Sequence, residues 1–226
     1  MPDVVYVAST WVIPALIAIT FHEAAHAFVA RMLGDETASR LGRVSLNPLK
    51  HIDPVGTILL PGLLLLARSS FLFGYAKPVP VNFRALRNPR RGMVWVAAAG
   101  PLMNLALAIV AALGFHFVGF LPTNGARWLA ENLRNALVLN VVLAIFNLFP
   151  LPPLDGGRIA VGLLPDAIAV PLARLERYGM AILIGLLIVL PLLGSQMGVD
   201  LSFISYLIKV ATSVVIDAIL RLTGNL

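Results

Sequence analysis

The sequence contains no cysteine. This absence excludes disulfide bonds, a thiolate nucleophile and any zinc site that depends on cysteine ligands. Charged residues are also scarce: they make up 12% of the chain, and only 11 residues are acidic. Apolar residues instead make up 59%, and the mean hydropathy is +0.89. This composition excludes an ordinary soluble domain and indicates a polytopic helical membrane protein.

The net charge of +6 does not indicate a nucleic-acid partner, because basic residues beside membrane spans set topology. The start of the sequence, residues 4–18, lacks the basic segment of a cleaved signal peptide, so we expect none. The longest polar stretches are too short for a separately folded module. We therefore expect one integral-membrane domain over residues 1–226, with its core at about 4–157 and C-terminal helices at about 166–226.

The apolar runs predict an all-α fold with about five to six transmembrane helices, because crossing a bilayer takes about 20 apolar residues. The expected helices cover residues 4–33, 93–118, 127–149, 179–193 and 201–220. Because the last of these contains Lys209 and Asp217, an interfacial position is an alternative for it. The run 55–73 is broken by Pro61-Gly62 and predicts a re-entrant hairpin. Alternating residues at 43–46 predict a short β segment.

The first apolar helix contains His22-Glu23-Ala24-Ala25-His26. Residues four apart lie on one face of a helix, so His22 and His26 can reach the same metal ion. Glu23 lies about 100° round the helix, where it can touch water at that metal without being a ligand. Charged and polar side chains are costly inside a membrane and need partners. A satisfied polar cluster is the alternative, but metal binding explains the pattern better.

Imidazole suits zinc, and a catalytic zinc site needs a third protein ligand and an open position for water. Among the few acids, Asp155 stands out because it follows a proline-rich helix end and precedes Gly156 and Gly157. The prolines end the helix, and the glycines allow the backbone to pass close to another element. Taken alone, Asp-Gly is also a common turn signature, so these residues leave both interpretations open.

HExxH in a membrane helix, together with the later Asn147-x-x-Pro-x-Pro-x-Leu-Asp155-Gly-Gly, resembles the site-2 protease family. Residues 99–104 (AGPLMN) and 73–82 (FGYAKPVPVN) are similar to further segments of its compact prokaryotic members. The resemblance implies one zinc ion per chain, bound by His22, His26 and Asp155, with Glu23 as catalytic base. It also implies that Asn147 helps to hold substrate or the developing oxyanion. No PDZ or CBS domain, common in relatives, is expected here.

The resemblance further implies an intramembrane metalloprotease that cuts single-span membrane proteins in the cell membrane of a prokaryote. Topology gives a separate constraint: His22 and Asp155 must lie on the same side of the membrane to share a metal. The segment 55–73 must then contribute no net crossing, which agrees with a re-entrant hairpin. This arrangement gathers Arg31, Lys50, Arg158, Arg174, Arg177 and the basic connector 77–91 on one face. The positive-inside rule makes that face cytoplasmic.

Three alternatives remain at this stage. A transporter with a polar core would be expected to show an inverted repeat, and we find none in the sequence. A non-proteolytic membrane binding protein would be marked by loss of Glu23 or of a ligand, yet all four residues are present. A different HExxH protease would use a downstream glutamate, Glu131 or Glu176, although both have weak local contexts. Asn104 is interpreted as a helix-packing polar residue or as support for catalysis.

Overall fold

The computed structural model describes residues 4–51, 53, 56, 59 and 77–226. Its long helices are α1 (Val4–Met32), α4 (Pro89–Gly114), α5 (Thr123–Asn147) and α10 (Phe203–Leu222). Shorter helices are α2 (Thr37–Arg40), α6 (Asp155–Leu163), α7 (Asp166–Arg174), α8 (Glu176–Ile184) and α9 (Leu190–Gln196). The π-helical turn η5 (Gly185–Val189) joins α8 to α9, and 3-10 turns occupy η1 (Pro48–Lys50), η3 (Phe83–Ala85) and η4 (Phe115–Phe120).

Within these described ranges, five helical stretches are long and apolar enough to cross a membrane. They are Val5–Met32, Pro89–Phe120, Thr123–Asn147, Asp166–Gln196 and Phe203–Leu222. The predicted all-α membrane fold is therefore confirmed. The second span begins four residues before its predicted start at 93, and local capping explains the difference. The side chain of Asn88 accepts a hydrogen bond from the Arg91 N–H, and Pro89 occupies the first helical turn, where no amide hydrogen is needed.

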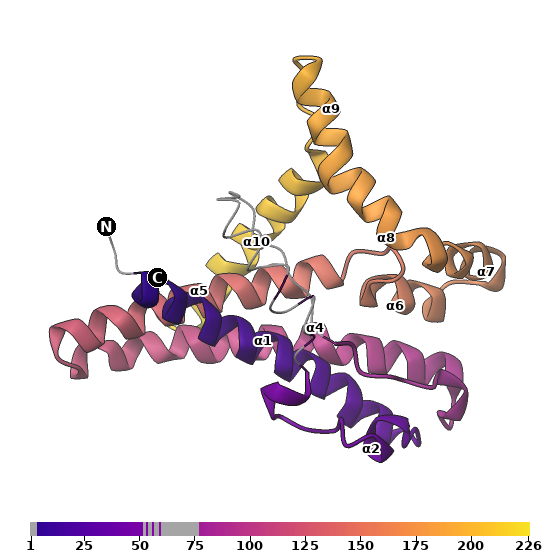
Figure 1. Cartoon of the computed structure of the whole chain (residues 1–226), viewed down its shortest axis with the longest axis horizontal. Coiled ribbons are helices and arrows are strands. Elements are labelled where there is room, and N and C mark those ends of the chain that lie inside the picture. The colour runs from indigo at the N-terminus through magenta and orange to yellow at the C-terminus, as the bar shows by residue number, and fades with distance from the viewer. Residues whose placement is uncertain (1–3, 52, 54–55, 57–58, 60–76) are drawn as a thin grey trace.

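Helices α1, α4 and α5 lie side by side and form the centre of the molecule (Figure 1). Hydrogen bonds join the first turns of α1 to the first half of α5: the Trp128 indole donates to Ser9 Oγ, and the Asn135 amide donates to the Thr10 carbonyl, each at 2.9 Å. Helix α10 packs on α4 and α5 through Ile219. Its neighbours there include small residues, which allow close helix approach.

The C-terminal end of α1 and the N-terminal end of α4 lie together. The Arg87 N–H donates to the Leu33 carbonyl at 3.0 Å, and the Asn82 N–H donates to the Asp35 carboxylate at 2.7 Å. The described residues at the two ends of the connection between α1 and α4 therefore lie close together. The predicted hairpin 55–73 itself lies outside the described residues, except for positions 56 and 59.

The predicted short β segment is wrong for the described residues. Residues 44 and 45 form a bend, residues 43 and 46 have no regular structure, and no strand occurs in the described ranges. The extended segment 77–82, which we call the strap, lies beside them, because Arg43 donates to the Lys77 carbonyl at 2.8 Å. Pro78 and Pro80 have no N–H group, so the strap cannot supply the donors of a regular β ladder. A side chain therefore makes the contact that a strand pair would otherwise make.

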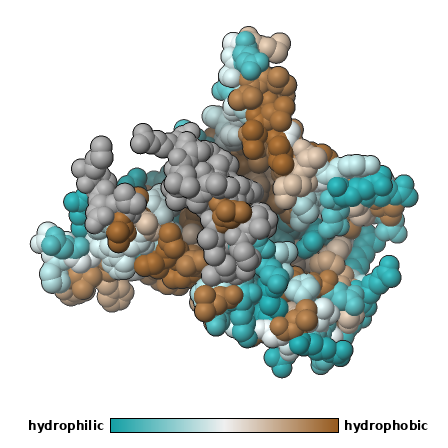
Figure 2. All heavy atoms as spheres, viewed as in Figure 1, coloured by the Kyte–Doolittle hydropathy of each residue, from teal (hydrophilic) through white to brown (hydrophobic). Residues whose placement is uncertain are grey.

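Hydrophilic and hydrophobic residues gather in different regions of the surface (Figure 2). Figure 2 shows hydrophilic residues gathered where α2 and α7 lie, and hydrophobic residues over much of α9. Exposed apolar side chains are frequent on the spanning helices, with Trp95 at 63% and Val110 at 63% exposure. Such surface is unfavourable in water and is expected where lipid covers it. The fold is that of a multi-pass membrane protein.

Candidate metal centre

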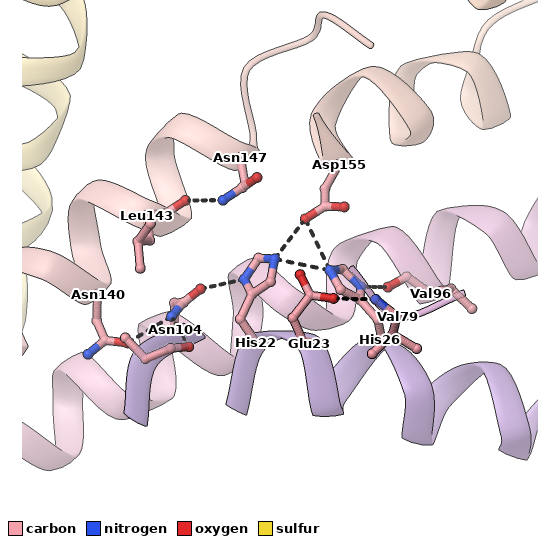
Figure 3. Close-up of polar contacts among 11 residues, drawn as sticks. His22, Glu23, His26, Val79, Val96, Asn104, Asn140, Leu143, Asn147 and Asp155 are labelled. Carbon is pink, nitrogen blue, oxygen red and sulfur yellow. Dashed lines mark hydrogen bonds and ion pairs between the residues drawn. The ribbon is translucent and has the colours of Figure 1, made fainter. Parts of the chain in front are cut away.

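Helix α1 places His22 and His26 one turn apart, with their rings directed to the same side (Figure 3). Asp155 is the first residue of α6 and reaches the same point. Its Oδ2 atom lies 3.2 Å from His22 Nε2 and 3.3 Å from His26 Nε2, and the two Nε2 atoms are 3.0 Å apart. All three residues are buried. Three potential metal ligands from distant parts of the sequence thus meet at one site.

Glycines make room for this convergence. A Cβ atom on Gly100 of α4 would lie 2.5 Å from atoms of both imidazoles, so a side chain there would displace the rings. A Cβ on Gly156 would meet the Leu148 carbonyl, and one on Gly157 would meet the backbone of Pro152, both at 2.1 Å. Close backbone approach therefore explains why Asp155 is followed by two glycines. The predicted reason for those glycines is confirmed by the geometry.

In each histidine, the hydrogen bond made by Nδ1 determines that the lone pair of the ring lies on Nε2. His22 Nδ1 lies 2.6 Å from the Asn104 side-chain oxygen, and His26 Nδ1 lies 2.7 Å from the Val96 carbonyl. Both partners are acceptors, so each Nδ1 carries the hydrogen and donates it. In the neutral rings, both Nε2 atoms then present lone pairs towards the shared point. This is the tautomer that binds a metal through Nε2.

Asn104 is itself held in one orientation. Its amide nitrogen donates to the Ala18 carbonyl at 3.2 Å and to the Asn140 side-chain oxygen at 2.8 Å. Asn140 in turn donates to the Ala136 carbonyl at 2.8 Å. With both amide hydrogens of Asn104 directed at acceptors, its oxygen must face His22. A buried chain of polar side chains from α5 through α4 thus orients a histidine of α1.

The donor set fits zinc. Two imidazole lone pairs and a carboxylate oxygen face one another, and no hydrogen is left between the two Nε2 atoms to join them. Asp155 Oδ2 is buried without a hydrogen-bond donor among the described residues, although it lies beside both rings. Zinc at about 2.0–2.2 Å from each ligand would separate tetrahedral ligand atoms by roughly 3.3 Å, close to the spacings of 3.0–3.3 Å here. A cation satisfies this arrangement, and an empty cluster of acceptors does not.

Glu23 lies beside the metal centre and contributes no atom to the three-residue group. Its Oε2 atom accepts a hydrogen bond from the Val79 backbone N–H at 2.7 Å. In Figure 3 its other oxygen faces the space where the two imidazoles and Asp155 converge. A carboxylate in this position can exchange a proton with water at the centre.

Comparisons with known proteins agree with this arrangement. A profile of peptidase family M50, the site-2 protease family, matches residues 123–191. The chain is 42% identical over 184 residues to "Putative zinc metalloprotease YwhC" of Bacillus subtilis (strain 168), covering 78% of this chain and 79% of that protein. The chain belongs to peptidase family M50.

Proteins named Rip2, with the same zinc metalloprotease description, match from two mycobacteria. The Mycolicibacterium smegmatis protein is 30% identical over 174 residues, covering 76% of this chain and 64% of that protein. The Mycobacterium tuberculosis (strain H37Rv) protein is 29% identical over 204 residues, covering 88% and 76% respectively. No solved structure matches the chain. Membership of the M50 family supports a membrane metalloprotease.

The M50 profile match includes Asp155 but not His22, Glu23 or His26, so the placement of these three near Asp155 depends on the geometry.

Asn147 is not joined to the cluster: its side-chain amide donates to the Leu143 carbonyl of its own helix at 3.0 Å. The alternative third ligands also lie elsewhere, since Glu131 pairs with Arg127, and Glu176 pairs with Arg158.

Sequence reasoning missed Asn140 and the backbone groups of Val79 and Val96. Asn140 could have been suspected, because an uncharged polar residue inside an apolar helix needs a partner. The two backbone groups carry no sequence signal, since every residue other than proline offers the same N–H and carbonyl.

Proposed function

We propose that this chain is an intramembrane zinc metalloendopeptidase that cuts single-span membrane proteins near the cytoplasmic face of a prokaryotic cell membrane. The observation that carries the proposal is the meeting of His22, His26 and Asp155 beside Glu23 at one buried point. His22, His26 and Asp155 would hold one zinc ion and leave a position open for water, as catalytic sites do. A transporter or a non-proteolytic binding protein gives Glu23 no comparable role.

When bound, zinc would supply Lewis acidity, which polarises a peptide carbonyl and makes water more acidic. Glu23 accepts the proton of the attacking water and then donates it to the leaving amine. Asn104 and the Val96 carbonyl keep the two imidazoles in their ligand tautomer throughout. We assign Asn147 to substrate or oxyanion contact, which requires its amide to turn away from the Leu143 carbonyl.

A substrate helix hides its carbonyl groups in hydrogen bonds between residues four apart, so it must unwind locally before attack. The proposed substrates are therefore spans with weak helices, containing glycine or other helix-breaking residues near the cytoplasmic end. The lipid bilayer delivers them laterally, and no nucleic acid takes part. The cytoplasmic assignment rests on the basic residues near the ends of α1, α4 and α7, including Arg31, Arg91 and Arg174.

Reconstitution tests this function directly. The purified chain is placed in liposomes with single-span membrane proteins whose spans differ in glycine content, and products are mapped by mass spectrometry. We expect cuts inside the span near its cytoplasmic end, loss of cleavage with 1,10-phenanthroline, and recovery on addition of zinc. Cleavage that survives chelation, or cuts confined to residues outside the span, would contradict the proposal.

The side of the membrane is tested by cysteine labelling, which is clean because the native chain has no cysteine. Single cysteines at Ser39 and Asn88 should react from the cytoplasmic side with a membrane-impermeant maleimide. A cysteine at Thr123, at the opposite end of the bundle, should react from the other side. The hydrogen bond from the Arg87 N–H to the Leu33 carbonyl supports this expectation, because it brings together the chain segments that carry Asn88 and Ser39. Labelling of Ser39 and Asn88 from opposite sides would separate His22 from Asp155 and refute the shared site.

A further inference from the structure

The orientation of the Glu23 carboxylate depends on a segment that lies far from it in the sequence. One of its oxygens accepts a hydrogen bond from the Val79 N–H, which lies 56 residues further along the chain. The other oxygen then faces the metal centre (Figure 3). A glutamate side chain otherwise has several rotatable bonds and would occupy many orientations. The donor that fixes it belongs to the strap, residues 77–82.

The sequence of the strap leaves the Val79 N–H without a neighbouring backbone donor on either side. Pro78 and Pro80 have no N–H group, so Val79 carries the sole backbone donor across these three positions. Each proline also biases the residue before it towards an extended conformation, which rigidifies Lys77 and Val79. The side chain of Val79 is 9% exposed and packs with Ala27 and Ala38. Ala27 belongs to α1, so the amide is held against the helix that carries Glu23.

Side chains anchor the strap on both sides of Val79. On one side, Arg43 Nη2 donates to the Lys77 carbonyl at 2.8 Å and lies 3.5 Å from the Pro78 carbonyl. On the other, Asp35 Oδ2 accepts the Asn82 N–H at 2.7 Å, and Asp35 is 1% exposed. Asp35 is fixed in turn by the hydroxyl and N–H of Thr37. The amide therefore sits between two independent clamps.

Asp35 is charged when it makes this contact. Burial opposes its ionisation, but hydrogen bonds from the Thr37 hydroxyl, the Thr37 N–H and the Asn82 N–H outweigh burial and hold the pKa of Asp35 below its ordinary value. A hydrogen bond to a charged acceptor is stronger than one between neutral groups. The hydrogen bond between the Asp35 carboxylate and the Asn82 N–H is therefore maintained at neutral pH.

We propose that the strap is a positioning device for the catalytic base, in which the Val79 N–H orients Glu23, and Arg43 and Asp35 hold the strap in place. This inference rests on the proposed role of Glu23 as base. The strap touches none of the three metal ligands in any described contact. It acts on the chemical step through Glu23, and it leaves zinc binding to the other residues.

The first test compares Val79→Pro with Val79→Ala in the full chain. Val79→Pro removes the donor, whereas Val79→Ala keeps the N–H and loses only side-chain packing. With a single-span membrane protein in liposomes as substrate, Val79→Pro should retain zinc and KM but lose roughly 10²-fold in kcat, the scale of a misplaced catalytic group. Val79→Ala should lose far less. Wild-type kcat in Val79→Pro would overturn the proposal.

If Val79→Pro fails to fold or loses zinc, the Arg43 variants decide. Arg43→Ala removes one of the two side-chain anchors without altering the backbone of the strap, and Arg43→Lys keeps a donor for the Lys77 carbonyl. We expect kcat to fall in Arg43→Ala with zinc retained, and to recover in part in Arg43→Lys. Equal kcat in Arg43→Ala and wild type would overturn the proposal.

Hydrogen exchange tests the contact without turnover. A strap peptide reports few amides, because Pro78 and Pro80 contribute none. Glu23→Leu removes the acceptor and should speed exchange of the Val79 amide, whereas Glu23→Gln keeps an acceptor oxygen and should preserve protection. Unchanged exchange in Glu23→Leu would refute the strap contact. Failure of wild type to cut any probe would instead count against the proposed function, so the two failures are distinguishable.

Discussion

Glu23→Gln should retain zinc and lose about 10²–10⁴-fold in cleavage rate, the usual contribution of a general base. Glutamine has nearly the size of glutamate and still offers an oxygen to the Val79 N–H, so the local structure should be preserved. Its amide cannot accept the proton of the attacking water. Cleavage is measured on reconstituted single-span substrates, and zinc by elemental analysis of the same preparation.

The matched control for this variant is Glu36→Gln. Glu36 lies at the start of α2 and pairs with Arg40 at the surface, away from the metal centre. Its substitution makes the same chemical change and should leave cleavage near wild type. A Glu23→Gln enzyme that cuts as fast as wild type would exclude Glu23 as the base, even if the metal is present.

Asp155→Ala should lose most bound zinc, because it removes the one carboxylate of the three-ligand cluster. His22→Ala and His26→Ala should do the same. The loss should exceed the roughly 10–100-fold that mutation of an outer-shell partner of a metal ligand typically costs, since a ligand itself is removed. Zinc is measured by elemental analysis after dialysis against a graded series of chelator concentrations.

Asp166→Ala provides the control for removal of an aspartate. Asp166 begins α7, pairs with Arg90 and is exposed to solvent. This variant should bind zinc as wild type does. Full zinc retention in Asp155→Ala would mean that the third ligand is a different residue, and it would remove the basis of the proposed site.

The sequence predicted the parts of the site that depend on local spacing. His22 and His26 are four residues apart, and helix geometry alone brings their rings together. Asp155 was singled out by prolines before it and glycines after it, which mark a sharp end of one helix and a close approach of backbone. The long apolar runs likewise predicted the spanning helices. Four have ends within about four residues of the prediction, as where the Asn88 cap acts, but the stretch Asp166–Gln196 begins well before its predicted start at 179.

The contacts that orient the site could not be predicted in the same way. The Asn140–Asn104–His22 chain joins three helices, and the pairing of helix faces is not encoded in the spacing of one sequence segment. The Val79 contact is harder still, because a backbone amide has no distinguishing residue type. The predicted β segment failed since alternation at 43–46 says nothing about whether a neighbouring strand can supply donors, and the prolines of the strap cannot.

The origin of the site's residues has a thermodynamic consequence. The candidate ligands come from α1 and α6, and the groups that orient the rings come from α4 and, through Asn140, from α5. A metal that binds only the assembled bundle stabilises it by mass action, by about 2.7 kcal/mol at a free metal concentration 100 times the Kd. Metal binding and helix association are thus linked equilibria, and the free energy of one is partly the free energy of the other. The zinc supply of the cell would then govern how much of the chain persists in its assembled form, as well as how fast it cleaves.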